Sequence, residues 1–287
     1  MHQERSPRHQ YPAAMVNITN RCTLRCCHCF VYRDGNPNRA ADEMGTPEMI
    51  AELTRLRDQH GIMAMLWMGG EPLLRPDVLE AGVPLFSWNH VTTNGTLDLI
   101  ELPGAHYVVS LDGPRDYNDS VRGKGSFDRV MRTLSRVPRK FASKVMVQCV
   151  VTAKNQDLME DLVKILVPTR AEGMTFSFYV PPRNDVSGLS FGTLENRDTA
   201  VRNALALKKK YPGFIWNGTR QLTLTLSENA LAVTRDCPSK KHVLPLYLTE
   251  KGFTHPFCCY GDDVCCDLCG AWVVFYLAEK MEKAGAK

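Results

Sequence analysis

The chain has 287 residues, 44% of them hydrophobic, so it is long enough to bury a large core. Its formal net charge of +4 comes from 35 basic and 31 acidic side chains spread along the chain, without the dense basic block of a nucleic-acid-binding protein. No apolar run reaches the roughly 18 residues of a membrane span, and the first twenty residues lack the apolar core of a secretory signal. These features predict a cytoplasmic protein that does not bind nucleic acid and has no membrane span.

Short apolar segments predict six strands in the first 180 residues. The segments are 14–19, 63–68, 90–95, 107–113, 144–152 and 174–180. Amphipathic stretches between them predict helices, the first capped by Thr46, continued by Pro47 and ended by Gly61. We expect Ser126 and Asn155 to cap two more. This alternation indicates successive βα units and a parallel sheet, with too few units for a complete eight-fold barrel.

The composition changes after Val180, where two prolines follow. We therefore predict a core domain at 1–185 and a C-terminal module at 186–287. Within the module we expect a polar helix at 193–211, short strands and loops from 217 onward, and a final helix at 271–283.

Eleven cysteines are many for a chain in a reducing compartment, where thiols serve catalysis or metal binding rather than disulfides. Ten of them fall in two clusters, at residues 22–29 and 237–269. Cys149 alone lies outside, in an apolar run that predicts a buried position.

The first cysteine cluster directly follows the first predicted strand. Cys22, Cys26 and Cys29 would thus lie at the carboxyl end of that strand, where α/β folds place their chemistry. Three thiolates can bind three irons of a [4Fe–4S] cube and leave the fourth iron without a protein ligand. The alternative is a structural zinc site, which would need a fourth ligand such as His28. The spacing favours the iron–sulfur cluster.

With the motifs that follow it, this cluster resembles the radical SAM (S-adenosylmethionine) superfamily. The matching blocks are Cys22/Cys26/Cys29, Gly69-Gly70-Glu71-Pro72, Thr93-Asn94-Gly95, and Ser110 to Asp112 followed by Arg122. Each block alone could be an ordinary turn, helix cap or surface charge, but their joint appearance at successive strand ends favours a cofactor site. The resemblance covers residues 14 to about 180. It implies an α/β fold, a partial (β/α)6 TIM-like barrel with a small cysteine-rich C-terminal extension.

The resemblance also implies roles for these residues. SAM-binding positions would be Gly69, Gly70, Glu71, Pro72, Asn94, Ser110, Asp112 and Arg122. Glu71 and the neighbouring backbone would bind the SAM amino group, and Arg122 would pair with the carboxylate, which suits its bidentate guanidinium. His28 would lie near the adenine, in place of the usual aromatic residue. In this family the cluster receives an electron from a donor such as flavodoxin or ferredoxin. SAM is then cleaved to a 5′-deoxyadenosyl radical that abstracts hydrogen from an unactivated carbon.

The second cluster resembles the shortened auxiliary-cluster modules of such enzymes, termed SPASM or twitch. Its cysteines are Cys237, Cys258, Cys259, Cys265, Cys266 and Cys269. We expect one auxiliary [4Fe–4S] cluster with four ligands, Cys237, Cys259, Cys266 and Cys269. Neighbouring residues point in different directions, so each adjacent pair supplies one ligand, and the choice within each pair stays open. The spare Cys258 or Cys265 would be a buried filler or a hydrogen-atom donor to a substrate radical. A zinc knuckle is the alternative to the auxiliary cluster.

Together these features predict a radical SAM enzyme that abstracts hydrogen from a small natural-product, sugar or lipid-like substrate. The net reaction would be an epimerisation, a dehydrogenation or a bond formation. Only about twenty residues precede the first motif, which disfavours the N-terminal peptide-recognition domain of many peptide-modifying relatives. Three alternatives stay open: a peptide-modifying (RiPP maturation) enzyme, an adenosyl-adding enzyme of the adenosylhopane synthase type, and a non-enzymatic iron–sulfur or zinc protein.

Overall fold

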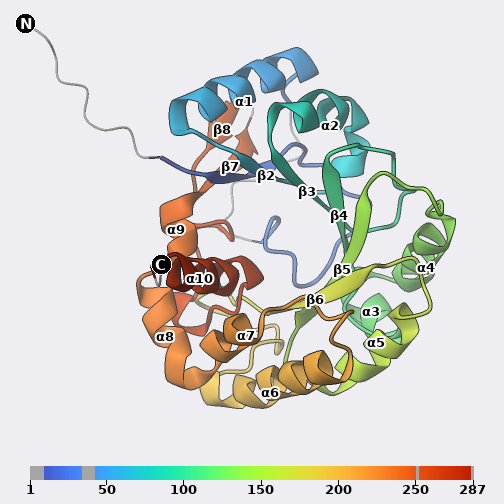
Figure 1. The fold of residues 1–287 in the computed structure, drawn as a ribbon, viewed down its shortest axis with the longest axis vertical. Helices are drawn as coiled ribbons and strands as arrows, with labels where there is room; N and C mark the ends of the chain where they lie inside the picture. The colour runs from blue at the N-terminus through green and yellow to red at the C-terminus, as the bar shows by residue number, and fades with distance from the viewer. Residues whose placement is uncertain (1–9, 34–42, 250–251, 286–287) are drawn as a thin grey trace, which may run out of the picture.

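A computed structural model describes residues 10–33, 43–249 and 252–285. Its centre is one curved sheet of eight strands in the order β6-β5-β4-β3-β2-β1-β7-β8, which forms an open arc in Figure 1. The strands are β1 Ala13–Asn17, β2 Ala64–Met68, β3 Trp88–Thr93, β4 Ala105–Ser110, β5 Lys144–Val151, β6 Gly173–Phe178, β7 Val243–Thr249 and β8 Gly252–Thr254. The first seven are parallel, whereas β8 is antiparallel to β7. The predicted partial barrel is confirmed.

Helices cover the convex side of this sheet (Figure 1). They are α1 Thr46–His60, α2 Pro76–Gly82, α3 Arg115–Arg122, α4 Ser126–Arg136, α5 Met159–Leu166 and α6 Leu194–Lys210. Alternate strand residues such as Val16, Trp67 and Val109 pack with buried helix residues such as Leu53 in one core cluster. Successive side chains of a strand point to opposite faces of the sheet, so the strand residues between these core residues face the concave side.

The starts of α1 and α4 follow the predictions to within one residue, whereas Asn155 precedes a 3-10 helix (Gln156–Leu158) and α5 begins only at Met159. Gly61 ends α1 in the left-handed conformation with φ 69°, and its N–H bonds to the Arg57 carbonyl, as expected of a glycine at this position. Thr46 and Ser126 are the first helical residues rather than the caps, because Gly45 and Gly125 take the cap positions.

The prediction of short strands and loops from 217 onward is wrong for the segment before β7. That segment forms α7 Thr219–Thr225, α8 Ser227–Arg235 and α9 Pro238–His242. Its threonines weigh against a helix locally, but Leu224 and Ala230 pack with Phe275 of the final helix α10 (Trp272–Gly285) in a second core cluster. Tertiary packing therefore overrides the weak local preference.

Strand β7 joins the central sheet beside β1, with Ala13 paired to Val243. The cysteine-rich part of the chain thus contributes a strand to the same sheet as residues 13–178. The predicted divisions 1–185 and 186–287 include residues 1–9, 34–42, 250–251 and 286–287, which lie outside the described part. Among the described helices, none is both long and apolar enough to cross a membrane.

Candidate functional site

The first cysteine loop follows β1 and packs directly on the glycine pair after β2. The Gly70 N–H donates to the Thr19 carbonyl at 2.8 Å, and the Glu71 N–H donates to the Arg21 carbonyl at 2.8 Å. A Cβ atom on Gly70 would lie 2.0 Å from the Arg21 carbonyl oxygen, and one on Gly69 would lie 2.5 Å from that of Thr19. Gly69 also has φ 147°, which disfavours any other residue. The two glycines therefore allow the close approach that positions the chain just before Cys22.

The three predicted cluster cysteines lie together on this loop. The Cys29 N–H bonds to the Cys26 carbonyl at 3.2 Å, and the Cys22 thiol accepts from Leu24 N–H and from Asn94 Nδ2 at 3.6 Å. The pKa of Cys26 is raised to about 11, chiefly by burial, while Arg122 acts against the rise and the Cys29 and Cys22 thiols contribute to it.

No group of three His, Cys, Asp or Glu side chains in the described residues is gathered closely enough to hold a single metal ion. Cys22, Cys26 and Cys29 offer three thiol donors on one loop, which is the donor chemistry of a [4Fe–4S] cube that leaves one iron without a protein ligand.

Glu71 connects the ends of β2 and β3. Its fully buried carboxylate accepts from Leu73 N–H at 3.1 Å, from Thr93 Oγ1 at 2.7 Å and from Asn94 N–H at 2.7 Å. Burial raises the pKa of this carboxyl group. In this arrangement Glu71 fixes Asn94, whose side chain in turn reaches the thiol of Cys22. Pro72 follows as the first residue of a short 3-10 helix and is buried.

Asp112, Arg122 and His28 form a buried charged group beside the cysteine loop. Asp112 Oδ2 accepts from Arg122 Nε at 2.6 Å and lies 3.1 Å from His28 Nε2, while Oδ1 accepts from Val150 N–H at 2.9 Å. Burial alone would raise the pKa of Asp112, but Arg122 and His28 hold it well below its usual range. Burial opposes the charged form of His28 as well, yet Asp112 raises its pKa.

Arg122 also lines an open pocket next to the first cysteine. The other described residues around it are Cys22, Thr23, Leu24, Arg25, Gly123, Lys124 and Arg129. Four of the eight lining side chains are cationic, so the pocket suits a ligand that carries a carboxylate. Ser110 lies at the end of β4, paired in register with Gln148 of β5.

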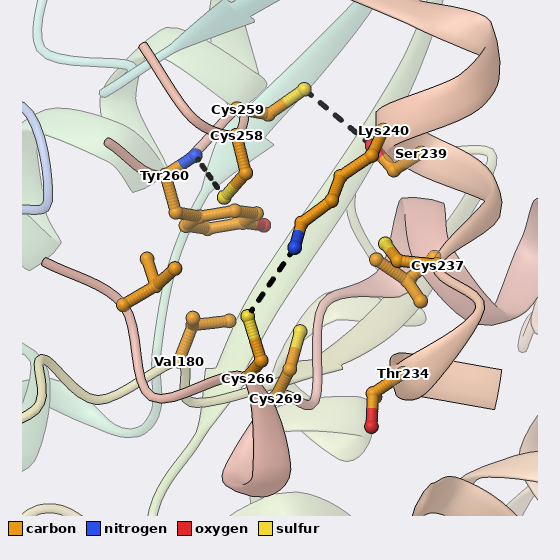
Figure 2. Close-up of a pocket in the computed structure, with 12 residues that line it drawn as sticks. Val180, Thr234, Cys237, Ser239, Lys240, Cys258, Cys259, Tyr260, Cys266 and Cys269 are labelled. Carbon is orange, nitrogen blue, oxygen red and sulfur yellow. Dashed lines mark hydrogen bonds between the residues drawn. The ribbon is translucent and has the colours of Figure 1, made fainter. Parts of the chain in front are cut away.

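Most of the second cysteine cluster surrounds a small enclosed cavity of about 20 Å³ (Figure 2). Cys237, Cys258, Cys266 and Cys269 all pack in the core cluster of α7, α8 and α10. N–H groups face their sulfurs: Tyr260 N–H donates to Cys258 at 3.2 Å, and Lys240 Nζ lies 3.8 Å from Cys266. Burial raises the pKa of Cys269 to about 12, and the backbone N–H of Ala271 acts against this rise. N–H groups that face several thiols are a feature of iron–sulfur sites.

Cys259 and Cys265 are oriented differently. The Cys259 sulfur points toward Ser239 Oγ at 3.5 Å (Figure 2), and its side chain packs with Met15 and Tyr247 in a separate cluster. Cys265 is not among the described residues that line the cavity, and its N–H bonds to the Pro181 carbonyl. Both Cys258 and Cys259 line the cavity, so the choice within this pair stays a prediction; of the two, only Cys258 packs in the same cluster as Cys237, Cys266 and Cys269. Cys149 is buried, as predicted.

The two cysteine regions contact each other through the end of the first loop. Arg33 donates to the carbonyls of Tyr260 at 2.7 Å and Val180 at 3.3 Å and pairs with Asp263 at 2.9 Å. The ring of Phe30 lies 4.6 Å from that of Tyr260. The loop that follows Cys29 is therefore fixed to the loop that follows Cys258.

A family model described as "Radical SAM superfamily" matches residues 16–166, more than half of the chain. The chain belongs to the radical SAM superfamily. Members of this superfamily use a [4Fe–4S] cluster and SAM, so the chain is an enzyme with these cofactors, and the predicted family is confirmed. The cysteines of its C-terminal part suggest an auxiliary cluster in addition.

The curated relatives of this radical SAM chain have names that state different activities. Fe-coproporphyrin III synthase of Methanosarcina barkeri is 37% identical over 134 residues, which are 43% of this chain and 33% of that protein. Probable GTP 3′,8-cyclase of Methanocella arvoryzae is 30% identical over 213 residues, 68% of each protein. Mycofactocin maturase MftC of Mycolicibacterium smegmatis is 31% identical over 160 residues, 52% of this chain and 40% of MftC.

Among solved structures, Streptococcus suis SuiB bound to its precursor peptide SuiA has a TM-score of 0.65 at 15% identity, covering 83% of this chain and 58% of SuiB. At this identity the likeness shows the fold. Because the chain spans a third of the synthase and less than two thirds of SuiB, its substrate is a matter for proposal.

Some residues around these sites carried no sequence signal. Asn17, at the concave end of β1, is completely buried, and neither of its side-chain amide atoms has a hydrogen-bond partner among the described residues. Arg197 of α6 is buried and donates to the carbonyls of Cys269, Leu268 and Thr225. Arg33 and Lys240 are ordinary surface residues by sequence alone. Their proximity to the cysteines arises only from the tertiary structure.

Proposed function

We propose that this radical SAM enzyme holds its [4Fe–4S] cluster with Cys22, Cys26 and Cys29 and binds SAM in the adjoining open pocket. The supporting observation is the convergence of four strand ends. The loop after β1 carries the cysteines, the glycines after β2 fix its backbone, Asn94 after β3 reaches Cys22, and Asp112 after β4 holds Arg122 and His28. When bound, the cluster and SAM supply a reductive cleavage that yields a 5′-deoxyadenosyl radical.

The residues of the chain then bind and orient. Arg122 keeps its Nε on Asp112 and has its remaining N–H groups for the SAM carboxylate, within a pocket that three other cations line. Glu71 acts through Asn94 and the backbone after β2, because both of its oxygens already accept hydrogen bonds within the protein. This differs from a direct bond of Glu71 to the SAM amino group. His28 lies against Asp112, where its ring is fixed for contact with the adenine.

For the auxiliary cluster we propose Cys237, Cys258, Cys266 and Cys269, in a module that begins near residue 186. Their common packing cluster and the N–H groups that face them support this set over one with Cys259. Neither Cys258 nor Cys265 is then proposed as a hydrogen-atom donor, since the first is a ligand and the second lies away from the cavity lining. The electron donor is a low-potential carrier of the flavodoxin or ferredoxin kind.

The substrate we propose is a small, uncharged but polar natural product or sugar, bound on the concave side of the sheet. Asn17 supports this class, because an amide without a partner at a buried position costs free energy unless a ligand satisfies it. Thr92, Gln148 and Thr175 also face this side, and none of them is charged. The relative named mycofactocin maturase favours a peptide as the second candidate.

The test is anaerobic reconstitution with iron and sulfide, followed by assay of 5′-deoxyadenosine formed from SAM and dithionite. The wild type is expected to bind about eight irons, four per cube, and to form the product. Cys26→Ala should form none, whereas the matched control Cys27→Ala, which changes the exposed neighbour, should retain cleavage. Undiminished cleavage by Cys26→Ala would contradict the assignment. Deuterium transfer from labelled candidate substrates into 5′-deoxyadenosine would then distinguish a small molecule from a peptide.

A further inference from the structure

Lys240 directs its ammonium group into the cysteine cavity. It lies in α9, three residues after Cys237, and in Figure 2 its side chain extends between Cys258 and Tyr260 on one side and Cys266 on the other. Nζ is 3.8 Å from the Cys266 sulfur and 3.5 Å from the centre of the Phe257 ring. The cation–π contact with Phe257 keeps the ammonium beside the sulfurs rather than out in water.

Lys240 is the one charged side chain among the described residues that line this cavity. Three of the lining side chains besides the thiols are polar but neutral: Thr234, Ser239 and Tyr260. No carboxylate is part of the described lining, so the ammonium has no acidic partner there. Two other cations contact the backbone of lining residues: Arg197 donates to the Cys269 carbonyl at 2.8 Å, and Arg33 donates to the Tyr260 carbonyl at 2.7 Å.

A cluster in this cavity would be anionic. Four thiolates outweigh the positive charge of the iron–sulfur core in either oxidation state, and one-electron reduction adds a further negative charge. A cation at hydrogen-bond distance from a ligand sulfur therefore stabilises the reduced state more than the oxidised state. The effect is strong here because the surrounding core residues Val180, Val264 and Val274 keep the local dielectric low.

We propose that Lys240 raises the reduction potential of the auxiliary cluster and so favours its uptake of one electron from the electron donor. The inference rests on the proposed auxiliary cluster and assigns Lys240 as a positioning residue that acts through the Cys266 thiolate, not as a ligand. In the half-reaction, the oxidised cluster takes up one electron from a low-potential one-electron carrier, with no proton or bond change at Lys240.

The alternative is a lysine that merely packs its methylene groups on Phe257 and extends toward water. Two substitutions distinguish an effect of the Lys240 charge on the potential from simple packing of its methylene groups. Lys240→Met keeps the aliphatic packing and removes the charge, whereas Lys240→Arg keeps the charge and an N–H donor. A purely structural role predicts no difference in potential between the Met variant and the wild type.

The experiment uses the full chain with Cys22, Cys26 and Cys29 changed to Ala, so that only the auxiliary cluster gives a signal. After anaerobic reconstitution, iron and sulfide content is measured, and the midpoint potential is determined by a redox titration followed by electron paramagnetic resonance. Lys240→Met is expected to shift the oxidised-to-reduced ratio at a given potential about tenfold toward the oxidised state, which is a fall of about 59 mV for one electron. Lys240→Arg should lie close to the parent.

An unchanged potential in Lys240→Met at full cluster content would overturn the role of Lys240 and leave the auxiliary cluster standing. A parent protein without any second cluster would overturn both. If Lys240→Met fails to assemble a cluster, Lys240→Gln supplies a second neutral variant. If both neutral variants lose the cluster while Lys240→Arg keeps it, Lys240 acts in cluster assembly, which would contradict its role in setting the potential.

Discussion

Backbone atoms of the central sheet position the first cysteine loop, whereas short segments that meet only in the folded chain form the second cysteine cavity. In the first region, Gly70 and Glu71 bond to the residues directly before Cys22. In the second, Cys237 precedes α9, Cys258 follows β8, and Cys266 and Cys269 flank a single 3-10 turn. The first site is therefore determined by spacing within one loop, and the second by how distant elements pack.

A change in the backbone that follows β2 should therefore damage the first site and spare the second. Gly70→Ala places a methyl group 2.0 Å from the Arg21 carbonyl oxygen, so the cysteine loop must move. We expect SAM cleavage to fall by about 100-fold or more, since a displacement of about 1 Å has that effect on an aligned site. The measurement is 5′-deoxyadenosine formation together with iron content.

The matched control for this change is Gly213→Ala, because no atom lies within 4 Å of a Cβ at that position. It should leave both activity and iron content unchanged. A Gly70→Ala enzyme that cleaves SAM like the wild type would show that the close contact does not position the loop.

The adjacent pair Cys258 and Cys259 tests the ligand set proposed for the second region. Cys258→Ala should remove the auxiliary cluster and lower the iron content from about eight to about four per chain. Cys259→Ala should keep about eight, because its sulfur contacts Ser239 and packs with Met15. Iron and sulfide analysis of both variants checks this, and the reverse pattern would restore the ligand set that the sequence suggested.

The same contrast explains what the sequence could predict. All six strands of residues 13–178 and the order of the motifs followed from apolar runs and spacing, because each motif lies on one loop. The expectation of short strands from residue 217 onward includes β7, but its bounds did not follow because Pro245 interrupts its apolar run, and α7 was missed because its threonines favour other structures. Sequence spacing does not predict the direction in which a side chain points. It therefore could not decide between Cys258 and Cys259 or predict that Lys240 approaches Cys266.

Removing the charge of Asp112 tests whether the stability of the first region also depends on its buried ion pair with Arg122. Asp112→Asn leaves Arg122 and His28 without their carboxylate, so we expect the free energy of unfolding to fall by about 3–5 kcal/mol. Urea unfolding at pH 7 measures the difference. The exposed pair of Arg115 and Asp128 supplies the control, since solvent screens this pair and Asp128→Asn should lower the free energy of unfolding far less than Asp112→Asn.

The difference in the free energy of unfolding between wild type and Asp112→Asn depends on pH in a direction that follows from the pKa values of Asp112 and His28. Folding lowers the pKa of Asp112, so its contribution is complete above the unfolded value of about 3.9 and is lost as the pH falls through the folded value. Because Asp112 also raises the pKa of His28, the gap between wild type and Asp112→Asn should widen as the pH falls from 7 through the unfolded histidine value of about 6.5, and it should narrow only below about pH 4. A gap that narrows already between pH 7 and pH 6 would assign the effect to another group.

The smallest expected effect concerns the contact between the two regions. Arg33→Met removes the hydrogen bonds to Tyr260 and Val180 and the pair with Asp263, and it keeps much of the aliphatic packing. Hydrogen bonds to a charged group contribute about 1.5–3 kcal/mol; the Arg33 side chain is 14% exposed and that of Asp263 is 27% exposed, so we expect a loss near the lower end, about 1.5–2 kcal/mol. Thermal unfolding should shift down by a few degrees as one transition, because β7 lies within the central sheet and couples the C-terminal part to it. Arg220→Met, which breaks an exposed pair with Glu282, is the control and should shift it less. Two separate transitions in Arg33→Met would instead mean that the cysteine-rich part unfolds on its own and that Arg33, rather than the shared sheet, joins the two regions.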